Sequence, residues 1–223
     1  MYHRHWYWLA DLCRREGIAF ILGHALYMKA VHGTKTKHDR EDGYKIARLV
    51  RGGNFPLAYV YPAEWRPTRD LLRRRGYLVR SRAELLTHIQ NTLTRYNLPA
   101  LNKKIAYNAN RAGVAEPSPY PVVRKSIEAD LELLDYLDAI IKRVELDLER
   151  TAKVHDSQTF FLVKTVPGVG KIIGMTLLYE ICTLDRFPAI GDFMSYCRLV
   201  RPKKTSAGKP TGEAGGKKMA TGI

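Results

Sequence analysis

The sequence predicts an α/β segment followed by an all-α remainder, and three observations indicate this fold class. Short apolar runs alternate with helical patterns before residue 66, which is typical of a sheet covered by helices. Beyond residue 66, apolar residues recur every three or four positions along two long segments. A further helical segment follows a Pro-Gly-x-Gly turn near residue 168. We therefore expect three parts, residues 1–65, 66–157 and 158–223.

The first part, residues 1–65, contains two helix–strand repeats. An apolar face predicts a helix over 6–15, and the apolar run 18–22 has the length of a buried strand. Helical spacing returns over 39–52, and residues 57–61 alternate like a second strand. These elements predict a small sheet with helices packed on it.

The second part, residues 66–157, is predicted to be a coiled-coil-like helical spacer. Apolar residues predict one long helix over 68–96 and a second of about 45 Å over 124–156. Prolines and asparagines predict a boundary loop over 97–123. The narrow apolar stripe of the second helix needs a partner helix. We favour the 68–96 helix of the same chain, with a second subunit as the alternative.

Composition argues against a membrane protein and a disulfide-built fold. The 223 residues include 45% hydrophobic side chains, enough for a buried core. No apolar run approaches the roughly 20 residues of a membrane span. The three cysteines are widely spaced and form no CxxC pair, so neither a disulfide framework nor a structural zinc site is predicted. We expect a cytoplasmic protein with no membrane partner.

Charge is segregated along the chain. The 37 Lys and Arg residues outnumber the 22 Asp and Glu residues, which gives a net charge of +15. The net charge is +12 over residues 1–122, −3 over 123–157 and +6 over 158–223. Basic ends of this strength predict a polyanionic partner, DNA or RNA. A uniformly solvated basic surface is the alternative.

Two acidic residues form the first candidate site. Asp39 and Asp42 begin a predicted helix and lie one turn apart on the same face. Carboxylates so placed suit Mg²⁺ or Mn²⁺, the ions of two-metal phosphodiester chemistry. On spacing alone, capping of the helix N-terminus is the better explanation. Two carboxylates also fall short of a complete two-metal site.

A glycine turn before the last helical segment is the second candidate. Gly168, Gly170 and Lys171 lie in a Pro-Gly-x-Gly-Lys turn that precedes the apolar helix 172–181. Such a turn leaves backbone N–H groups available to a nucleic-acid phosphate, as in helix-hairpin-helix proteins. A plain tight turn between two helices explains the same glycines equally well.

Two basic segments complete the candidate nucleic-acid contacts. One is a run of seven arginines, namely Arg66, Arg69, Arg73, Arg74, Arg75, Arg80 and Arg82. The other is the tail, in which Lys203, Lys204 and Lys209 surround Ser206. Arginine suits phosphate geometrically, and cations beside Ser206 favour its hydroxyl as a nucleophile. The alternatives are a solvated helix face and an ordinary loop serine.

Eight strings, in this order, carry a family resemblance. They are WYWLAD (6–11), LGHALYMKA (22–30), KxDxxD (37–42), YVYP (59–62), RDLLRRR (69–75), HIQNT (88–92), VPGVGK (166–171) and RFP (186–188). Together they resemble the DEDD transposases of the insertion sequence 110 family, over nearly the whole chain to about Lys209.

The resemblance implies a recombinase with two catalytic parts. The first part would have an RNase-H-like fold with four metal-binding acids, of which Asp39 and Asp42 match the last two. In the C-terminal part, Ser206 matches the serine that attacks DNA. The resemblance further implies homo-oligomers joined through the long helices and a structured guide RNA as partner.

This chain also departs from the family pattern. The first two acids of the family have no counterpart, and the residues after Lys209 diverge. We therefore expect a fragment cut at both ends, with weak or absent Mg²⁺ or Mn²⁺ binding and little or no strand transfer alone. A non-catalytic DNA- or RNA-binding protein and an oligomerisation module built on the 124–156 helix are the alternatives.

Overall fold

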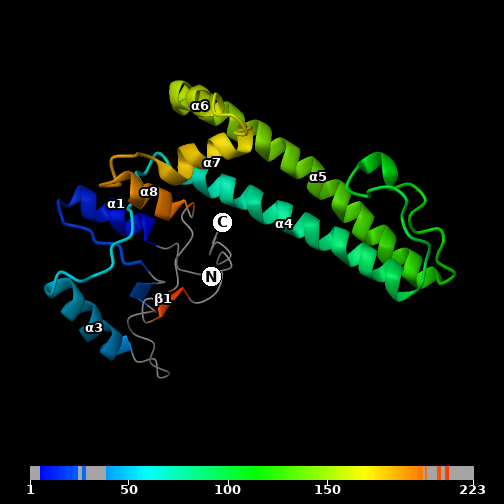
Figure 1. The fold of residues 1–223 in the computed structure, drawn as a ribbon, viewed down its shortest axis with the longest axis horizontal. Helices are drawn as coiled ribbons and strands as arrows, with labels where there is room; N and C mark the ends of the chain where they lie inside the picture. Colours follow the sequence, from blue (N-terminus) through cyan, green and yellow to red (C-terminus); the bar gives the residue numbers. More distant parts are fainter. Residues whose placement is uncertain are drawn as a thin grey trace. The chain divides into compact units, whose positions relative to one another are not determined.

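Helices dominate the described structure (Figure 1). The computed structural model describes residues 6–24, 27–28, 39–197, 199, 205–206 and 209–210. The chain divides into two compact units, residues 1–66 and 67–223. No helix among the described residues is long and apolar enough to cross a membrane. The all-α character predicted beyond residue 66 is confirmed.

Two helices and two extended segments make up the described part of the first unit. α1 (Tyr7–Arg15) is followed by Gly17, whose φ of +67° favours glycine. α3 (Asp39–Arg51) begins with three acids in its first turn, which complement the helix dipole. Extended backbone follows each helix, over 18–24 and 54–62.

The sheet predicted for this unit is not supported by the structure. Where strands were expected at 18–22 and 57–61, the described residues form only an isolated antiparallel bridge between Gly23 and Leu57. The Ala58 N–H donates to Leu22 O at 2.7 Å, and no longer ladder forms. A pair of short strands without further neighbours is marginal in water. The prediction of an RNase-H-like α/β fold is corrected accordingly for the described residues.

Arg66 holds the first unit together. Its side chain is buried, and its Nε donates to Tyr61 O at 2.7 Å. Its Nη1 donates to the Asp11 carboxylate at 2.9 Å. The guanidinium also lies 4.8 Å from the Trp6 ring centroid and 5.0 Å from that of Tyr7. Within the first unit, this arginine therefore ties α1 to the second extended segment.

An antiparallel helix pair forms the long part of the second unit. α4 (Arg66–Arg95) and α5 (Pro121–His155) run in opposite directions (Figure 1). Apolar residues line their seam, namely Leu78, Ile89, Leu93, Ile127, Leu134, Leu137 and Ile141. The helices predicted over 68–96 and 124–156, and their pairing within one chain, are confirmed. Coiled-coil packing in the strict sense stays a prediction.

The connection between α4 and α5 is a packed loop. Its only regular element among the described residues is the 3₁₀ turn η1 (Asn108–Asn110). Ile105, Val114 and Ala115 are buried in one apolar cluster with residues of both helices. The segment predicted to be a boundary loop thus closes the end of the helix pair.

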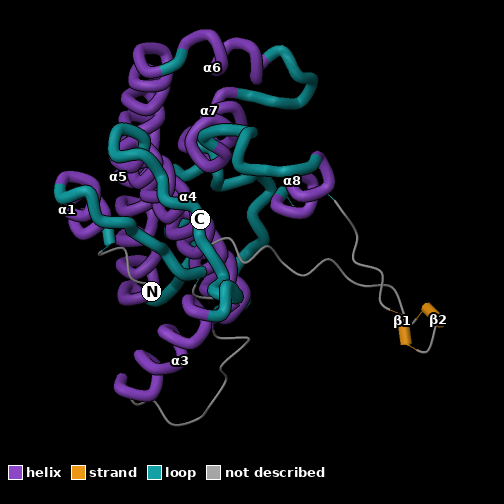
Figure 2. The backbone as a smooth tube through the Cα atoms, turned by 90° about the vertical axis from the view of Figure 1, so that its left-hand side faces the viewer, coloured by secondary structure: helices purple, strands orange, loops and turns teal. Residues whose placement is uncertain are grey.

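Three shorter helices follow α5. α6 (Ser157–Lys164) is capped by Asp156, whose carboxylate accepts the Thr159 N–H at 3.0 Å. α7 (Lys171–Ile181) packs against α5 and α6, and α8 (Ile190–Tyr196) comes after it (Figure 2). Beyond α8, β1 (Thr205–Ser206) pairs antiparallel with β2 (Lys209–Pro210).

Candidate nucleic-acid interface

The turn between α6 and α7 is open to solvent. Gly168 has a φ of +84°, a conformation that favours glycine. A Cβ at Gly168 or Gly170 would meet no atom within 4 Å. Gly170 is the N-cap of α7 and has no side chain to satisfy the first N–H groups of that helix. This geometry leaves room for a phosphate, and the helix-hairpin-helix interpretation stays a prediction.

The neighbouring helices fix this turn in place. A Cβ at Gly174 of α7 would lie 3.3 Å from Lys164 Cγ, so α6 and α7 approach closely there. Lys171 Nζ donates to Glu149 of α5 at 2.7 Å. Hydrogen bonds from Lys171 and then Lys153 lower the pKa of Glu149 to about 2. The Lys171 side chain is still 60% exposed, so it remains accessible to a ligand.

Several of the predicted phosphate-binding arginines are paired with acids of the same chain. Arg75 lies 2.6 Å from Glu145 of α5. Arg82 donates to Asp138 of α5. The acids of α5 therefore neutralise part of the arginine run on α4, a pairing that spans 56 to 70 residues of sequence.

Glu180 forms ion pairs with two more of these arginines. This residue of α7 is 7% exposed. Arg69 Nε donates to its Oε2 at 3.0 Å, and Arg73 donates from Nε to Oε1 at 2.6 Å and from Nη2 to Oε2 at 2.9 Å. The cluster fastens α7, and hence the glycine turn before it, to α4. The only sequence signal for it was an isolated acid in an otherwise apolar helix.

The remaining arginines of the run are exposed. Arg74 lies over the Tyr77 ring at 4.8 Å from its centroid, and Arg80 is also on the surface. Contact between the seven arginines and DNA stays a prediction. Burial of Arg66 and Arg69 favours Arg74 and Arg80 for that role.

The C-terminal end of α7 is anchored as well. Arg186 Nη1 donates to Ile181 O at 3.2 Å, and the Tyr196 hydroxyl donates to Glu180 O at 3.2 Å. These side chains satisfy carbonyl groups that the helix end leaves without intrahelical partners. They connect α8 to α7.

The acidic pair lies on the surface of the first unit. Asp39 and Asp42 are exposed in the first turn of α3, and Asp42 is 3.7 Å from Lys45 Nζ. Within the described ranges, no group of three or more His, Cys, Asp or Glu residues is placed to hold a metal ion. Asp39 and Asp42 supply carboxylates of the kind that Mg²⁺ takes, but only two of those that a complete two-metal site needs. Capping and metal binding both stay predictions.

The predicted nucleophile lies in a short strand pair. Ser206 of β1 is opposite Lys209 of β2 in the antiparallel register. Lys203 and Lys204 lie outside the described residues.

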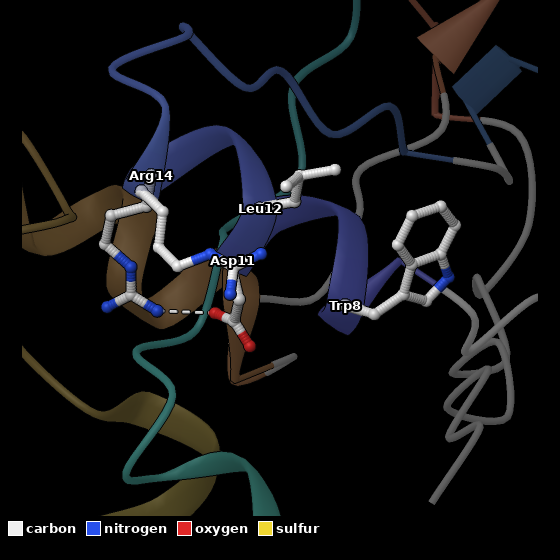
Figure 3. A pocket seen from close by; sticks show the side chains of 5 residues that line it. Trp8, Asp11, Leu12 and Arg14 are labelled. Atoms are coloured by element: carbon white, nitrogen blue, oxygen red, sulfur yellow. Dashed lines mark hydrogen bonds and ion pairs between the residues drawn. The ribbon is translucent and has the colours of Figure 1, made fainter.

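A hollow of about 470 Å³ lies on α1 (Figure 3). Its lining residues are Trp8, Asp11, Leu12, Arg14 and Arg15. Burial raises the pKa of Asp11, but hydrogen bonds from Arg14 and Arg66 and their positive charges bring it below its ordinary value. Figure 3 shows Asp11 bonded to Arg14. Asp11 thus forms ion pairs with Arg14 and Arg66.

Comparison with known proteins found a family that is similar to part of the second unit. Residues 161–219 match the family described as Transposase IS116/IS110/IS902 family. The matched segment includes the glycine turn, α7 with Glu180, α8 and the short strand pair. No curated protein and no solved structure matches the chain. The resemblance indicated by the sequence strings is confirmed over residues 161–219, the segment that is similar to the transposase IS116/IS110/IS902 family.

Proposed function

We propose that the chain binds DNA and serves in the transposition of an insertion sequence. The family match over residues 161–219 carries this proposal, because it covers the open glycine turn and the basic tail. The turn is held on α5 by the bond from Lys171 to Glu149, which gives it a fixed geometry. Backbone N–H groups at a helix start bind phosphate without reading base sequence. The proposed contact therefore positions DNA and does not select it.

A charge placed in the turn tests the proposal. Gly170→Glu adds a carboxylate on a side chain whose Cβ would meet no atom within 4 Å, so we expect the helices to keep their positions. We expect affinity for duplex DNA to fall by roughly fivefold or more at low salt, because the added charge repels phosphate. Gly43→Glu is the matched control, since Gly43 is equally open and the net charge changes equally. Equal losses in both variants would refute a contact at the turn.

For catalysis, we propose Ser206 as the attacking group, as the family resemblance implies. Its oxygen would bond to a DNA phosphorus and displace a strand end, with its proton passing to the leaving oxygen. Mg²⁺ or Mn²⁺ would be held weakly at Asp39 and Asp42, the two matching acids. We therefore expect this chain alone to give little or no strand transfer. Robust recombination of a matching donor by the purified protein, with Mn²⁺ and the RNA of the element, would contradict this expectation.

Further copies of this chain and a structured guide RNA are the proposed partners. Self-association is supported by three side chains on α5, Leu133, Tyr136 and Leu146, which are 47%, 60% and 46% exposed. Exposed apolar surface of this kind is common at interfaces. Sedimentation velocity of Leu133→Ser beside the parent chain tests the contact. A monomeric parent chain would exclude it.

A further inference from the structure

The loop end of the α4–α5 pair concentrates positive charge. This end, residues 95–125 (the tip), contains six Lys or Arg residues and one acid, Glu116. Five of the six bases are exposed and form no ion pair with a described carboxylate, namely Arg95, Lys103, Lys104, Arg124 and Lys125. Over residues 126–157, by contrast, nine acids face four bases. A polyanion is therefore attracted to the tip and repelled by the acidic stretch beyond it.

Exposed tyrosines lie among these bases. Tyr96, Tyr107 and Tyr120 are 42%, 65% and 56% exposed. The rings of Tyr96 and Tyr120 are 5.8 Å apart and inclined at 52° to each other. Aromatic faces beside cations are what unpaired nucleotides bind, because bases stack on the rings while phosphates meet the charges.

Buried arginine contacts hold the loop that carries Tyr107. Arg111 is buried, and its Nε donates to Ile105 O at 3.0 Å while its Nη2 donates to Asp138 at 2.6 Å. Arg82 Nη2 donates to Ala106 O at 2.6 Å. The backbone just before Tyr107 is therefore held on the helices, which reduces the conformational freedom that is lost when a base stacks on this tyrosine.

We propose that the tip binds unpaired DNA, with bases stacked on Tyr96, Tyr107 and Tyr120 and phosphates held by the surrounding lysines and arginines. In duplex DNA the bases are already stacked on each other, so exposed rings contribute little there. The proposal rests on the proposed DNA function and adds a second surface, separate from the glycine turn. The proposal also specifies that this surface binds single-stranded DNA, such as strands that are opened during recombination.

Fluorescence anisotropy with the full chain tests the proposal. A labelled thymidine 20-mer and a labelled 20-base-pair duplex are titrated with the parent chain and with Tyr107→Ala, Tyr107→Phe and Tyr44→Ala. We expect Tyr107→Ala to weaken single-strand binding by about tenfold, with duplex binding changed less than twofold. Tyr107→Phe should retain most of the affinity because its ring still stacks. Tyr44 is the matched control, since it is 62% exposed on α3 outside the tip.

The possible outcomes distinguish single-strand binding at the tip from the proposed DNA function of the whole chain. Equal losses for Tyr107→Ala and Tyr44→Ala, or no loss for either, would overturn single-strand binding at the tip while leaving duplex binding intact. A uridine 20-mer bound tightly where the thymidine strand is not would assign the tip to RNA and overturn the choice of DNA. A parent chain that binds no duplex would refute the proposed function itself. The melting temperature of each variant confirms folding, because Tyr107 contributes little buried surface.

Discussion

Glu180 shows how one side chain can fix the geometry around a proposed binding turn. Its carboxylate accepts hydrogen bonds from Arg69 and Arg73, and the three side chains are 10%, 10% and 20% exposed. Removing one partner of a buried ion pair is costly, because the remaining charge loses its counter-charge in a place shielded from water. We therefore expect the carboxylate to stabilise the packing of α7 on α4.

Removing this charge should destabilise the second unit. We predict that Glu180→Gln lowers the free energy of unfolding by about 3 kcal/mol, measured by urea denaturation. Glu132→Gln is the control, since Glu132 is exposed on α5, and its effect should stay within about 0.5 kcal/mol. Similar midpoints for the two variants would show that the cluster contributes no stability.

The ion pairs of Glu149 predict that the stability of the folded chain depends on pH. Its pKa is lowered from 4.5 to about 2 by Lys171 and Lys153, so the folded state favours the ionised form. The stabilisation is fully present above pH 4.5 and is lost as pH falls toward 2. We predict that the urea midpoint of the parent chain exceeds that of Glu149→Gln at pH 6 and that the difference shrinks below pH 4.5. A difference independent of pH would contradict the assignment.

The sequence could predict the charged residues but not their partners. The arginine run is plain from residues 66–82. Its acids lie on other helices, as with Arg73 and Glu180, which are 107 positions apart. No local pattern encodes such a pair, because it arises only once the helices are packed. Phosphate binding and internal pairing therefore look alike in the sequence.

At the level of elements, helices were predicted well and strands were not. The stripe through Ile127, Leu134 and Ile141 marks the buried face of α5, since helical periodicity is local. The apolar run 18–22 has the composition of a strand, yet a strand also requires hydrogen-bonded neighbours that no local pattern reveals. Turn residues did mark the ends of elements, as Gly17 and the glycine turn before α7 show.

The loop that closes the helix pair depends on one buried arginine. Arg111→Met removes bonds to Ile105 O and to Asp138 but keeps most of the side-chain volume. We predict a loss of about 2 kcal/mol in unfolding free energy and faster amide hydrogen exchange over 105–118. Mass spectrometry of exchange would measure both the site and its extent. Unchanged protection in that segment would show that apolar packing alone orders the loop.

For the whole molecule, the distribution of charge along the sequence differs from its distribution in the folded chain. The basic stretch before residue 123 and the acidic stretch after it are partners in the α4–α5 pair, so their charges partly cancel. Among the described residues, exposed bases remain at the tip, at the glycine turn with Lys171, and at Arg74 and Arg80 of α4. These are the described places where we expect DNA to bind.

The affinity of the full chain for duplex DNA across a salt series tests the central claim most directly. Each neutralised phosphate adds about −0.9 to the slope of log affinity against log salt. We predict a slope of about −3 or steeper, because the tip presents five exposed bases that form no ion pair with a described carboxylate. A folded chain that does not bind at low salt, or whose affinity is flat across the series, would contradict the account.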